Sequence, residues 1–327
     1  MKKKVSIKSK LFAHLETWRP YTGIWCGLVS LVGACLAYQT FPPYHIAFFA
    51  FIIPMMGWTA GLYLSDFLDR KLDLIEKPHR PIPSGRIHPY EALIIGVVFA
   101  GIGLVVSIYL SIYNLALVFV TAFLVLGYAK YTKSKGILGN INRGMVTIAA
   151  YLYGVFTINQ SLDYFPIYIW LLSFVFLIHD TNSNLVGAIR DMKGDKEGGY
   201  QTIPVKYGLK NSIFIALFLN IIWYTVLLGI IFSYDFLKIE FYYVFIIDVI
   251  ILVALYVYLF NSINNYTRKR ALRFHEFFVI ERIVLASALI FGVVEINKAA
   301  IIFGVALLIT IVAQVLLRKR YEFEAVS

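Results

Sequence analysis

Three aspartates stand at helical spacing where a long apolar stretch gives way to a charged one. Asp66, Asp69 and Asp73 follow one another at i, i+3 and i+7, so a helix that continues through them places all three on one face. Carboxylates crowded on one face repel each other unless a cation lies between them. Mg²⁺ takes oxygen ligands, typically one or two carboxylates together with substrate phosphates and waters. The spacing therefore indicates a divalent-cation site.

The segment directly after this cluster carries helix-stopping and phosphate-binding residues. It reads Glu-Lys-Pro-His-Arg-Pro-Ile-Pro-Ser-Gly-Arg over residues 76–86, and its three prolines end the helix and stiffen the loop. Lys77 and Arg80 are natural phosphate ligands, Lys as a point charge and Arg through its planar fork. Taken alone, the cluster and its loop fit a solvated helix end equally well, because polar residues flank every membrane span.

A second polar stripe lies toward the end of another apolar stretch, 166–189. Asp180, Asn184, Asp191 and Asp195 stand at i, i+4, i+11 and i+15, again on one helical face. Such a stripe is costly against lipid, so we expect it to face a cavity, and an intramembrane ionisable residue is by default a hypothesis about function. For Asp180 and Asn184 the alternative is a polar contact between two helices.

The two clusters are more specific as a pair than either is alone. Both fall at the same predicted end of their helices, where they would present five carboxylates to a shared site. That much negative charge is stable only when cations neutralise it. Two Mg²⁺ ions there would neutralise a diphosphate and stabilise it as a leaving group. We therefore expect Mg²⁺ as the cofactor and the following residues as its ligands and catalytic carboxylates: Asp66, Asp69, Asp73, Asp191 and Asp195.

Ten apolar stretches position these clusters. Of the 327 residues, 60% are hydrophobic and 15% charged, and the mean hydropathy is +0.74, whereas soluble domains average about 45–50% apolar and 25% charged. Stretches of about 20 residues are long enough for a helix to cross the roughly 30 Å of hydrocarbon, within which every backbone group must be satisfied. The sequence predicts an all-α, polytopic transmembrane helical bundle of about ten spans, a single membrane domain over residues 1–327. The spans are expected at about 21–41, 45–65, 91–111, 114–129, 144–159, 166–189, 211–233, 241–260, 275–294 and 298–317.

The net charge of +11 is explained by topology. Of the 30 Lys and Arg residues, 27 fall in the two terminal segments and in every second connection, which leaves only Lys238, Lys298 and Arg282 elsewhere. By the positive-inside rule, the basic side is cytoplasmic. We therefore expect an integral multi-pass membrane protein with both termini and the opening of the active site on the cytoplasmic side, and no nucleic-acid partner.

At this point the motifs resemble those of a known family. Ser65 to Asp73, followed by Arg-Pro-Ile-Pro-Ser-Gly, is similar to the Asn-Asp-x-x-Asp-x-x-x-Asp signature of the UbiA superfamily of intramembrane prenyltransferases. Asp-Met-Lys-Gly-Asp at 191–195 resembles its second Asp-x-x-x-Asp motif, and Tyr-Ala-Lys-Tyr-Thr-Lys-Ser-Lys-Gly-Ile-Leu-Gly-Asn at 128–140 resembles its Tyr…Lys…Gly-Asn segment. The resemblance covers about residues 15–295.

The resemblance implies a fold and a substrate site. The fold is an all-helical barrel of nine spans around a lipid-accessible chamber, to which 298–317 adds an extra C-terminal helix. The two aspartate motifs would bind an isoprenoid diphosphate through Mg²⁺. The expected diphosphate-binding residues are Lys77, Arg80, Tyr128, Lys133, Ser65, Asn184 and Arg190. Lys130 or Lys135 could replace Lys133, and Ser65, which stands where the family has Asn, implies a weaker or water-mediated contact.

The function implied is Mg²⁺-dependent transfer of an isoprenoid group from a prenyl diphosphate to an aromatic small-molecule acceptor, at a site bordered by membrane lipid. Three alternatives stay open: a terpene cyclase that needs no acceptor, transfer to a glycerol phosphate lipid, and transfer to a tetrapyrrole. A transporter is disfavoured, because the acidic residues lie at helix ends rather than at the membrane midplane.

Other ionisable residues also lie inside the apolar stretches. Asp248, Glu281 and Arg282 are each expected to have a partner on another helix, since buried charges are usually paired. His179 and Asp180 fit equally well as a base near the acceptor or as a structural hydrogen-bonded pair.

Overall fold

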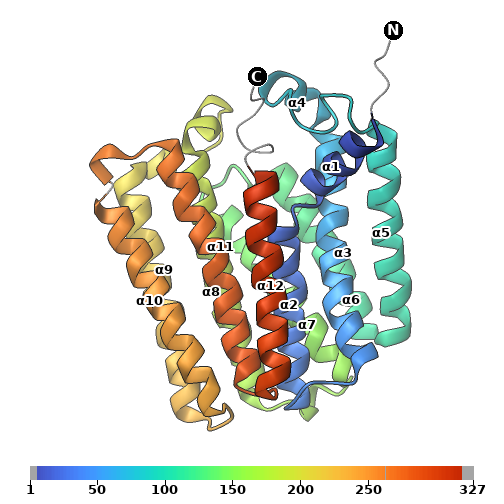
Figure 1. Ribbon diagram of the computed structural model, residues 1–327, viewed down its shortest axis with the longest axis vertical. Coiled ribbons are helices and arrows are strands. Elements are labelled where there is room, and N and C mark those ends of the chain that lie inside the picture. Colours follow the sequence, from blue (N-terminus) through green and yellow to red (C-terminus); the bar gives the residue numbers. More distant parts are fainter. Residues whose placement is uncertain (1–5, 262, 319–327) are drawn as a thin grey trace.

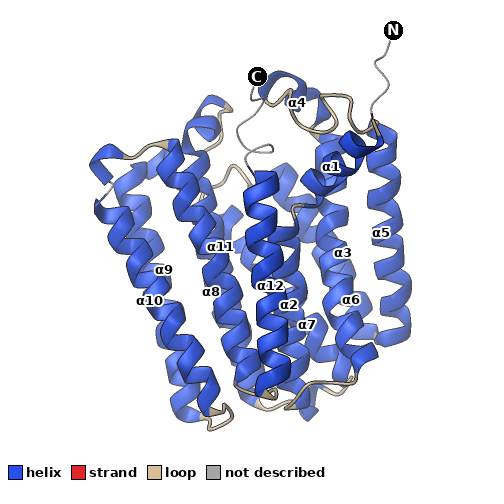
Figure 2. Cartoon of the chain, viewed as in Figure 1, coloured by secondary structure: helices blue, strands red, loops and turns tan. Residues whose placement is uncertain are grey.

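The computed structural model describes residues 6–261 and 263–318. Within them, regular structure is helical apart from one isolated bridge between Lys135 and Gln201, which confirms the all-α prediction (Figures 1 and 2). The α-helices are α1 (Ile7–Trp18), α2 (Pro20–Tyr38), α3 (Tyr44–Leu68), α4 (Arg70–Glu76), α5 (Pro89–Leu110), α6 (Ile112–Gly127), α7 (Ile137–Ile158), α8 (Ile167–Glu197), α9 (Ile203–Ser233), α10 (Ile239–Asn261), α11 (Arg268–Phe291) and α12 (Ile296–Ala313). Shorter turns are η1 (Tyr128–Thr132), η2 (Leu162–Tyr164), η3 (Ile263–Asn265) and η4 (Gln314–Arg318).

Each of the ten predicted stretches is a helix. Six described helices, α2, α3, α5, α9, α10 and α12 with η4, are long and apolar enough to cross a membrane, and α6 is apolar but shorter. The count of ten spans stays a prediction, because α7, α8 and α11 are long but carry many polar residues. Two details differ from expectation: residues 7–18 form a helix, and α9 begins at Ile203 and is kinked at Gly208, where φ is +78°.

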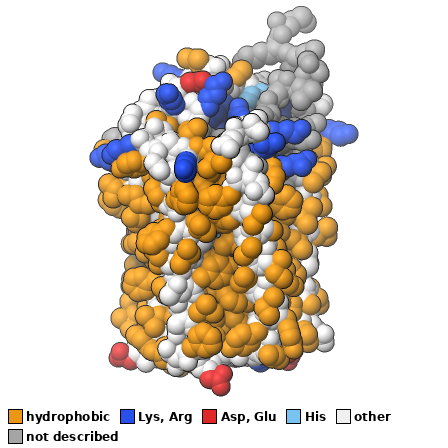
Figure 3. Space-filling model, turned by 90° about the vertical axis from the view of Figure 1, so that its left-hand side faces the viewer, with side chains coloured by type: hydrophobic (Ala, Val, Ile, Leu, Met, Phe, Trp, Pro, Cys, Tyr) orange, Lys and Arg blue, Asp and Glu red, His pale blue; other side chains and the backbone are white. Residues whose placement is uncertain are grey.

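Charge is distributed along the long axis of the bundle as the sequence indicates. Figure 3 shows apolar side chains over the middle of the molecule and Lys and Arg gathered at the end where α1 and α4 lie in Figure 1. The first and last described segments meet at that end, where Phe12 of α1 packs against a cluster that includes Leu317 of η4. Residues 1–5 and 319–327, which contribute to the predicted charge asymmetry, lie outside the described residues.

Helix α2 is the centre of the bundle. Of its most apolar stretch, 89% is buried inside the protein, and it packs against α3, α7, α11 and α12. Gly33 and Gly154 let α2 and α7 cross in direct backbone contact, since a Cβ atom at Gly154 would overlap the Ser30 carbonyl oxygen and one at Gly33 would overlap that of Tyr151.

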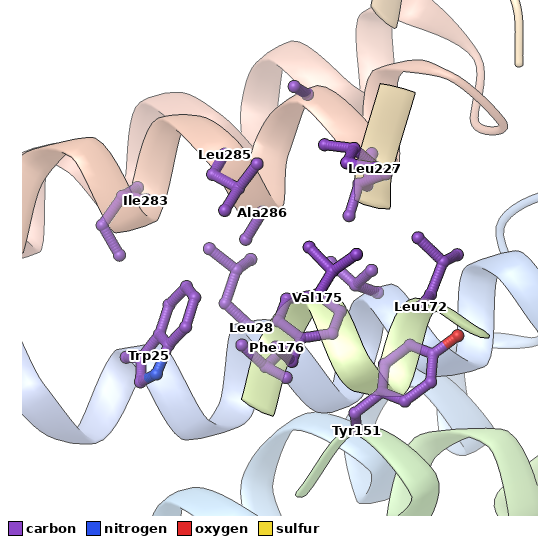
Figure 4. Close-up of a cluster of buried hydrophobic side chains, with 14 of the residues drawn as sticks. Trp25, Leu28, Tyr151, Leu172, Val175, Phe176, Leu227, Ile283, Leu285 and Ala286 are labelled. Atoms are coloured by element: carbon purple, nitrogen blue, oxygen red, sulfur yellow. The ribbon is translucent and has the colours of Figure 1, made fainter. Parts of the chain in front are cut away.

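A large apolar core holds α2 to the helices around it (Figure 4). The Trp25 ring meets the Phe176 ring edge-on at 6.2 Å, and Phe176 lies 5.0 Å from the Tyr151 ring. Side chains of α9 and α11, including Leu227, Ile283, Leu285 and Ala286, complete the cluster. This core fixes α7, α8 and α11 relative to each other, and these three helices carry several of the polar residues described next.

Candidate active site

One cavity of about 1710 Å³ contains every site residue that the sequence predicts. Its walls come from α2, α3, α5, α6, α7, α8 and α11 and from the loops at the basic end of the bundle. The predicted residues that line it are Ser65, Asp66, Asp69, Asp73, Lys77, Arg80, Tyr128, Lys133, Asn184, Arg190, Asp191 and Asp195. The structure thus brings both aspartate clusters, which are over one hundred residues apart in sequence, into one space.

The first cluster lies at a junction between two helices. α3 ends at Leu68 and α4 begins at Arg70, so the predicted continuous helix is interrupted at Asp69. The interruption is small, because the Asp69 amide still donates to the Ser65 carbonyl (2.8 Å) and the Asp73 amide to the Asp69 carbonyl (2.9 Å). The three carboxylates therefore keep nearly helical spacing and line the same cavity.

Arginines neutralise the buried members of this cluster. Asp66 is 5% exposed and its Oδ1 lies 3.4 Å from Nη2 of Arg19. Asp73 is 3% exposed and accepts a hydrogen bond of 2.8 Å from Nη1 of Arg80. Asp69 remains exposed. The proline-rich loop after α4 thus turns Arg80 back onto the cluster that precedes it.

The second cluster lies on α8, which continues as one helix to Glu197 and keeps its polar residues on one face. Nε and Nη2 of Arg190 donate to the two carboxylate oxygens of Asp191 at 2.9 and 2.6 Å. Burial acts to raise the pKa of Asp191, but Arg190 outweighs it and the pKa is lowered. Burial and the neighbouring Asp191 raise the pKa of Asp195 to about 6, although the Thr202 hydroxyl donates to it at 3.2 Å.

Lysines from two loops face the same space. Burial and Arg80 lower the pKa of Lys77. Burial acts to lower the pKa of Lys133, but Tyr200, Tyr128 and the nearby carboxylates raise it overall, so Lys133 is cationic. Its Nζ lies 4.7 Å from the centre of the Tyr200 ring.

The choice among the three candidate lysines favours Lys133. Its side chain lines the cavity, whereas Lys135 is absent from the cavity wall and forms the bridge to Gln201. The side chain of Lys130 lies outside the described residues. Further along the cavity wall, the side-chain amides of Asn140 and Asn184 meet at 2.9 Å and join α7 to α8.

The donor set fits Mg²⁺ only when phosphate oxygens share the ion. Among residues 6–261 and 263–318, no three His, Cys, Asp or Glu side chains come close enough to hold a metal by themselves. Mg²⁺ normally combines one or two carboxylates with substrate phosphates. Two carboxylate clusters across one cavity, paired with arginines, match that mode and not an all-protein metal cage.

The structure adds cavity residues whose role the sequence did not reveal. Arg19, which lies between α1 and α2, pairs with Asp66. Arg143, counted among the basic residues of a cytoplasmic connection, lies inside α7 and lines the cavity. Its only sequence signal is its position about one helical turn after Asn140, the last residue of the motif-like segment 128–140. Trp58 and Arg282 also line the cavity.

The buried ionisable residues have partners on other helices, as expected. Nε2 of His179 lies 3.1 Å from Glu281, and the Tyr224 hydroxyl donates to Asp248 at 2.7 Å. His179 and Asp180 do not form a pair with each other. His179 is fully buried, whereas Asp180 lines the cavity.

Comparison with known proteins is consistent with this geometry. Residues 26–281 match the model of the UbiA prenyltransferase family. The chain is 31% identical over 248 residues to digeranylgeranylglyceryl phosphate synthase of Methanobrevibacter smithii, covering 74% of this chain and 85% of that protein. The synthase of the same name from Pyrococcus horikoshii is 30% identical over 204 residues, covering 62% and 72% respectively.

Solved structures share the fold. An apo UbiA homolog from Aeropyrum pernix K1 superposes with a TM-score of 0.70 at 16% identity, covering 82% of this chain and 97% of that one. A UbiA homolog from Archaeoglobus fulgidus bound to DMAPP and Mg²⁺ gives 0.59 at 14% identity, covering 84% and 99%. Because the family model spans most of the sequence and the fold agrees, this chain is an integral, multi-pass membrane prenyltransferase that belongs to the UbiA prenyltransferase family.

Proposed function

We propose that this prenyltransferase uses Mg²⁺ and transfers an isoprenoid group from a prenyl diphosphate to a glycerol phosphate lipid. The aromatic acceptor expected from the sequence has no support among the relatives cited above, which are named for a glyceryl phosphate product. Their product, by its name, carries two geranylgeranyl groups. Transfer of one geranylgeranyl group to a glyceryl phosphate that already carries another would give this product. The lipid acceptor, one of the alternatives left open by the sequence, is therefore preferred.

One observation carries the proposal: the two aspartate clusters face a single cavity whose remaining wall is largely apolar. The polar end holds the clusters together with Lys77, Arg80 and Lys133, and the wall beyond includes Leu117 and Val118 of α6. A diphosphate would lie at the charged end, and an isoprenoid chain would run along the apolar wall.

The side chains of the cavity have complementary roles in this reaction. Lys77, Arg80 and Lys133 would bind the diphosphate oxygens, and the aspartates of both clusters would hold Mg²⁺ against them. Mg²⁺ bound there would neutralise the diphosphate as a leaving group. The apolar wall keeps water from the reacting carbon. The carbon–oxygen bond to diphosphate breaks, the acceptor hydroxyl oxygen forms the new ether bond, and its proton leaves to water or to the departing diphosphate.

The orientation belongs to the same proposal. Charge asymmetry favours both chain termini and the opening near α4 on the cytoplasmic side, where a water-soluble diphosphate leaving group can depart.

The test is product analysis with purified protein in detergent. Geranylgeranyl diphosphate is incubated with Mg²⁺, alone and with geranylgeranylglyceryl phosphate, a phenolic acid or a tetrapyrrole. The proposal expects an ether lipid only with the glyceryl phosphate and loss of product in excess EDTA. A hydrocarbon formed without acceptor would instead identify a cyclase, and a prenylated phenol would restore the aromatic acceptor.

A further inference from the structure

Two further arginines line the cavity in addition to the cations that pair with the aspartate clusters. Arg143 of α7 and Arg282 of α11 both line the wall. Arg282 contacts Asp180, which lies eleven residues before Asp191 on α8, about 16 Å along a helix axis. Arg143 lies against Trp58 and Tyr128. The proposed diphosphate site has its own cations, so these two arginines have no assigned partner in the reaction.

Arg282 is held in place by neighbouring helices. Its Nη1 lies 3.7 Å from Oδ1 of Asp180 and 3.3 Å from the Ser183 hydroxyl, and the residue is 7% exposed. Oδ2 of Asp180 accepts a hydrogen bond of 2.8 Å from Thr147 of α7. One guanidinium is thus fixed by one carboxylate, and its buried Nε has no hydrogen-bond partner within the described part of the chain.

Arg143 supplies a positive charge that no acid neutralises. Its guanidinium carbon lies 4.1 Å from the centre of the Trp58 ring and 5.8 Å from that of Tyr128. Among the described residues it forms no ion pair, and it lies within electrostatic range of Arg282. Arg143, Arg282 and Asp180 together therefore give this level of the cavity a net charge of about +1.

Such a charge requires an explanation, because an arginine inside a membrane is costly and usually faces a partner or a functional cavity. Here the cavity offers room for a ligand, and the Arg143 guanidinium lies over the Trp58 ring. A guanidinium fork matches the geometry of phosphate and carboxylate oxygens in a bidentate manner. An anionic group bound beside Arg143 would neutralise its charge.

We propose that Arg143 and Arg282 bind the phosphate monoester of the acceptor lipid. This inference rests on the proposed function and adds a specific subsite to it. The acceptor would enter with its phosphate anchored at the arginines and its free hydroxyl directed toward the prenyl carbon at the aspartate clusters. Phosphate binding at this depth would select a glycerol phosphate over a neutral glycerol lipid, and Asp180 would act as a positioning residue for Arg282.

The test compares Arg143→Gln with wild type, using Arg273→Gln as the matched control, since Arg273 is an exposed arginine of α11 that is absent from the cavity wall. In steady-state assays, Arg143→Gln should raise the KM for geranylgeranylglyceryl phosphate by about tenfold or more, as loss of a charge-assisted hydrogen bond does. The KM for geranylgeranyl diphosphate should stay within about twofold. Arg143→Lys, which keeps the charge and loses the fork, should be intermediate and covers the case in which Arg143→Gln does not fold.

A binding measurement separates failure of the subsite from failure of the proposed function. Calorimetric titration of geranylgeranylglyceryl phosphate into wild type, Arg143→Gln and Arg273→Gln requires no turnover. Two results together support the subsite even if no product forms. Arg143→Gln should fail to bind the phosphate lipid while Arg273→Gln binds it, and wild type should fail to bind a lipid that lacks the phosphate. Equal affinity in all three proteins, or tighter binding of a phenolic acid than of the phosphate lipid, would overturn it.

Discussion

The strongest test of the site is whether the two aspartate clusters act as one unit. Five aspartates line the charged end of the cavity: Asp66, Asp69, Asp73, Asp191 and Asp195. The cations that face them are Arg19, Lys77, Arg80, Lys133, Arg190 and Arg268. These charges nearly cancel, so the protein alone offers little net positive charge to a diphosphate, and most of its neutralisation must come from ions that both clusters hold.

The expected loss of rate follows from this balance of charges. Replacing Asp69 or Asp191 with Asn removes one carboxylate from the shared ions without changing side-chain size much. Metal stabilisation of a leaving group is worth several kcal/mol, and each 1.36 kcal/mol is about a tenfold change in rate. Each single variant should therefore lose roughly 10²- to 10³-fold in kcat. The double variant should be only slightly slower than either one, because residues that act as one unit are not additive.

The assay is single-turnover release of diphosphate from labelled geranylgeranyl diphosphate with saturating acceptor in detergent. Asp163→Asn serves as the control, because Asp163 is exposed in η2 and absent from the cavity wall. Circular dichroism confirms folding. A double variant whose loss equals the product of the two single losses would show that the clusters act independently, and a single variant within threefold of wild type would remove that residue from the site.

Three further predictions concern protonation, packing and topology. Because the pKa of Asp195 is about 6, its carboxylate is ionised above that pH and protonated below it. The Mg²⁺ concentration for half-maximal rate should therefore rise as the pH falls from 7 to 5. Asp195→Asn should flatten this dependence. Gly154→Ala should destabilise the protein by about 1–3 kcal/mol through overpacking between α2 and α7, measured as lower thermal stability, while Gly101→Ala, with open space around it, should not. Cysteines placed at 234–238 and at 263–267 should be labelled from opposite sides of the membrane, and labelling from the same side would contradict the topology.

The sequence predicts those features that depend only on residues close to each other along the chain. Apolar stretches separated by polar connections locate all ten long helices, because lipid imposes length and composition on each helix separately. Both aspartate clusters are equally local, since helical spacing alone places Asp191 and Asp195 on one face. The break at Asp69 is not predictable in this way, because the sequence that follows Asp69 remains compatible with helix.

The acceptor subsite depends on tertiary packing, and this explains why the sequence misses it. Arg143, Asp180 and Arg282 come from three different helices, and nothing in their spacing shows that they meet. The sequence places Arg143 in a connection because the apolar stretch is expected to begin at residue 144, whereas α7 begins at Ile137. The choice of acceptor depends on such residues, so the aromatic acceptor was an expectation carried by the family resemblance alone.

The helices that are poorest as isolated membrane spans are those that build the site. α7, α8 and α11 are absent from the six that are long and apolar enough to cross a membrane, and they contribute Asn140, Arg143, Asp180, Asp191 and Arg282 to the cavity. Polar groups of this kind are costly against lipid. Neighbours such as α9, which packs against α8, and α10, which packs against α11, provide lipid-facing surface, since each is 33% buried over its most apolar stretch. The same penalty that forces these helices inward also concentrates their charged side chains around one cavity. In a chain that is 60% hydrophobic, low apolarity of a long helix therefore points to the site of chemistry before any motif is considered.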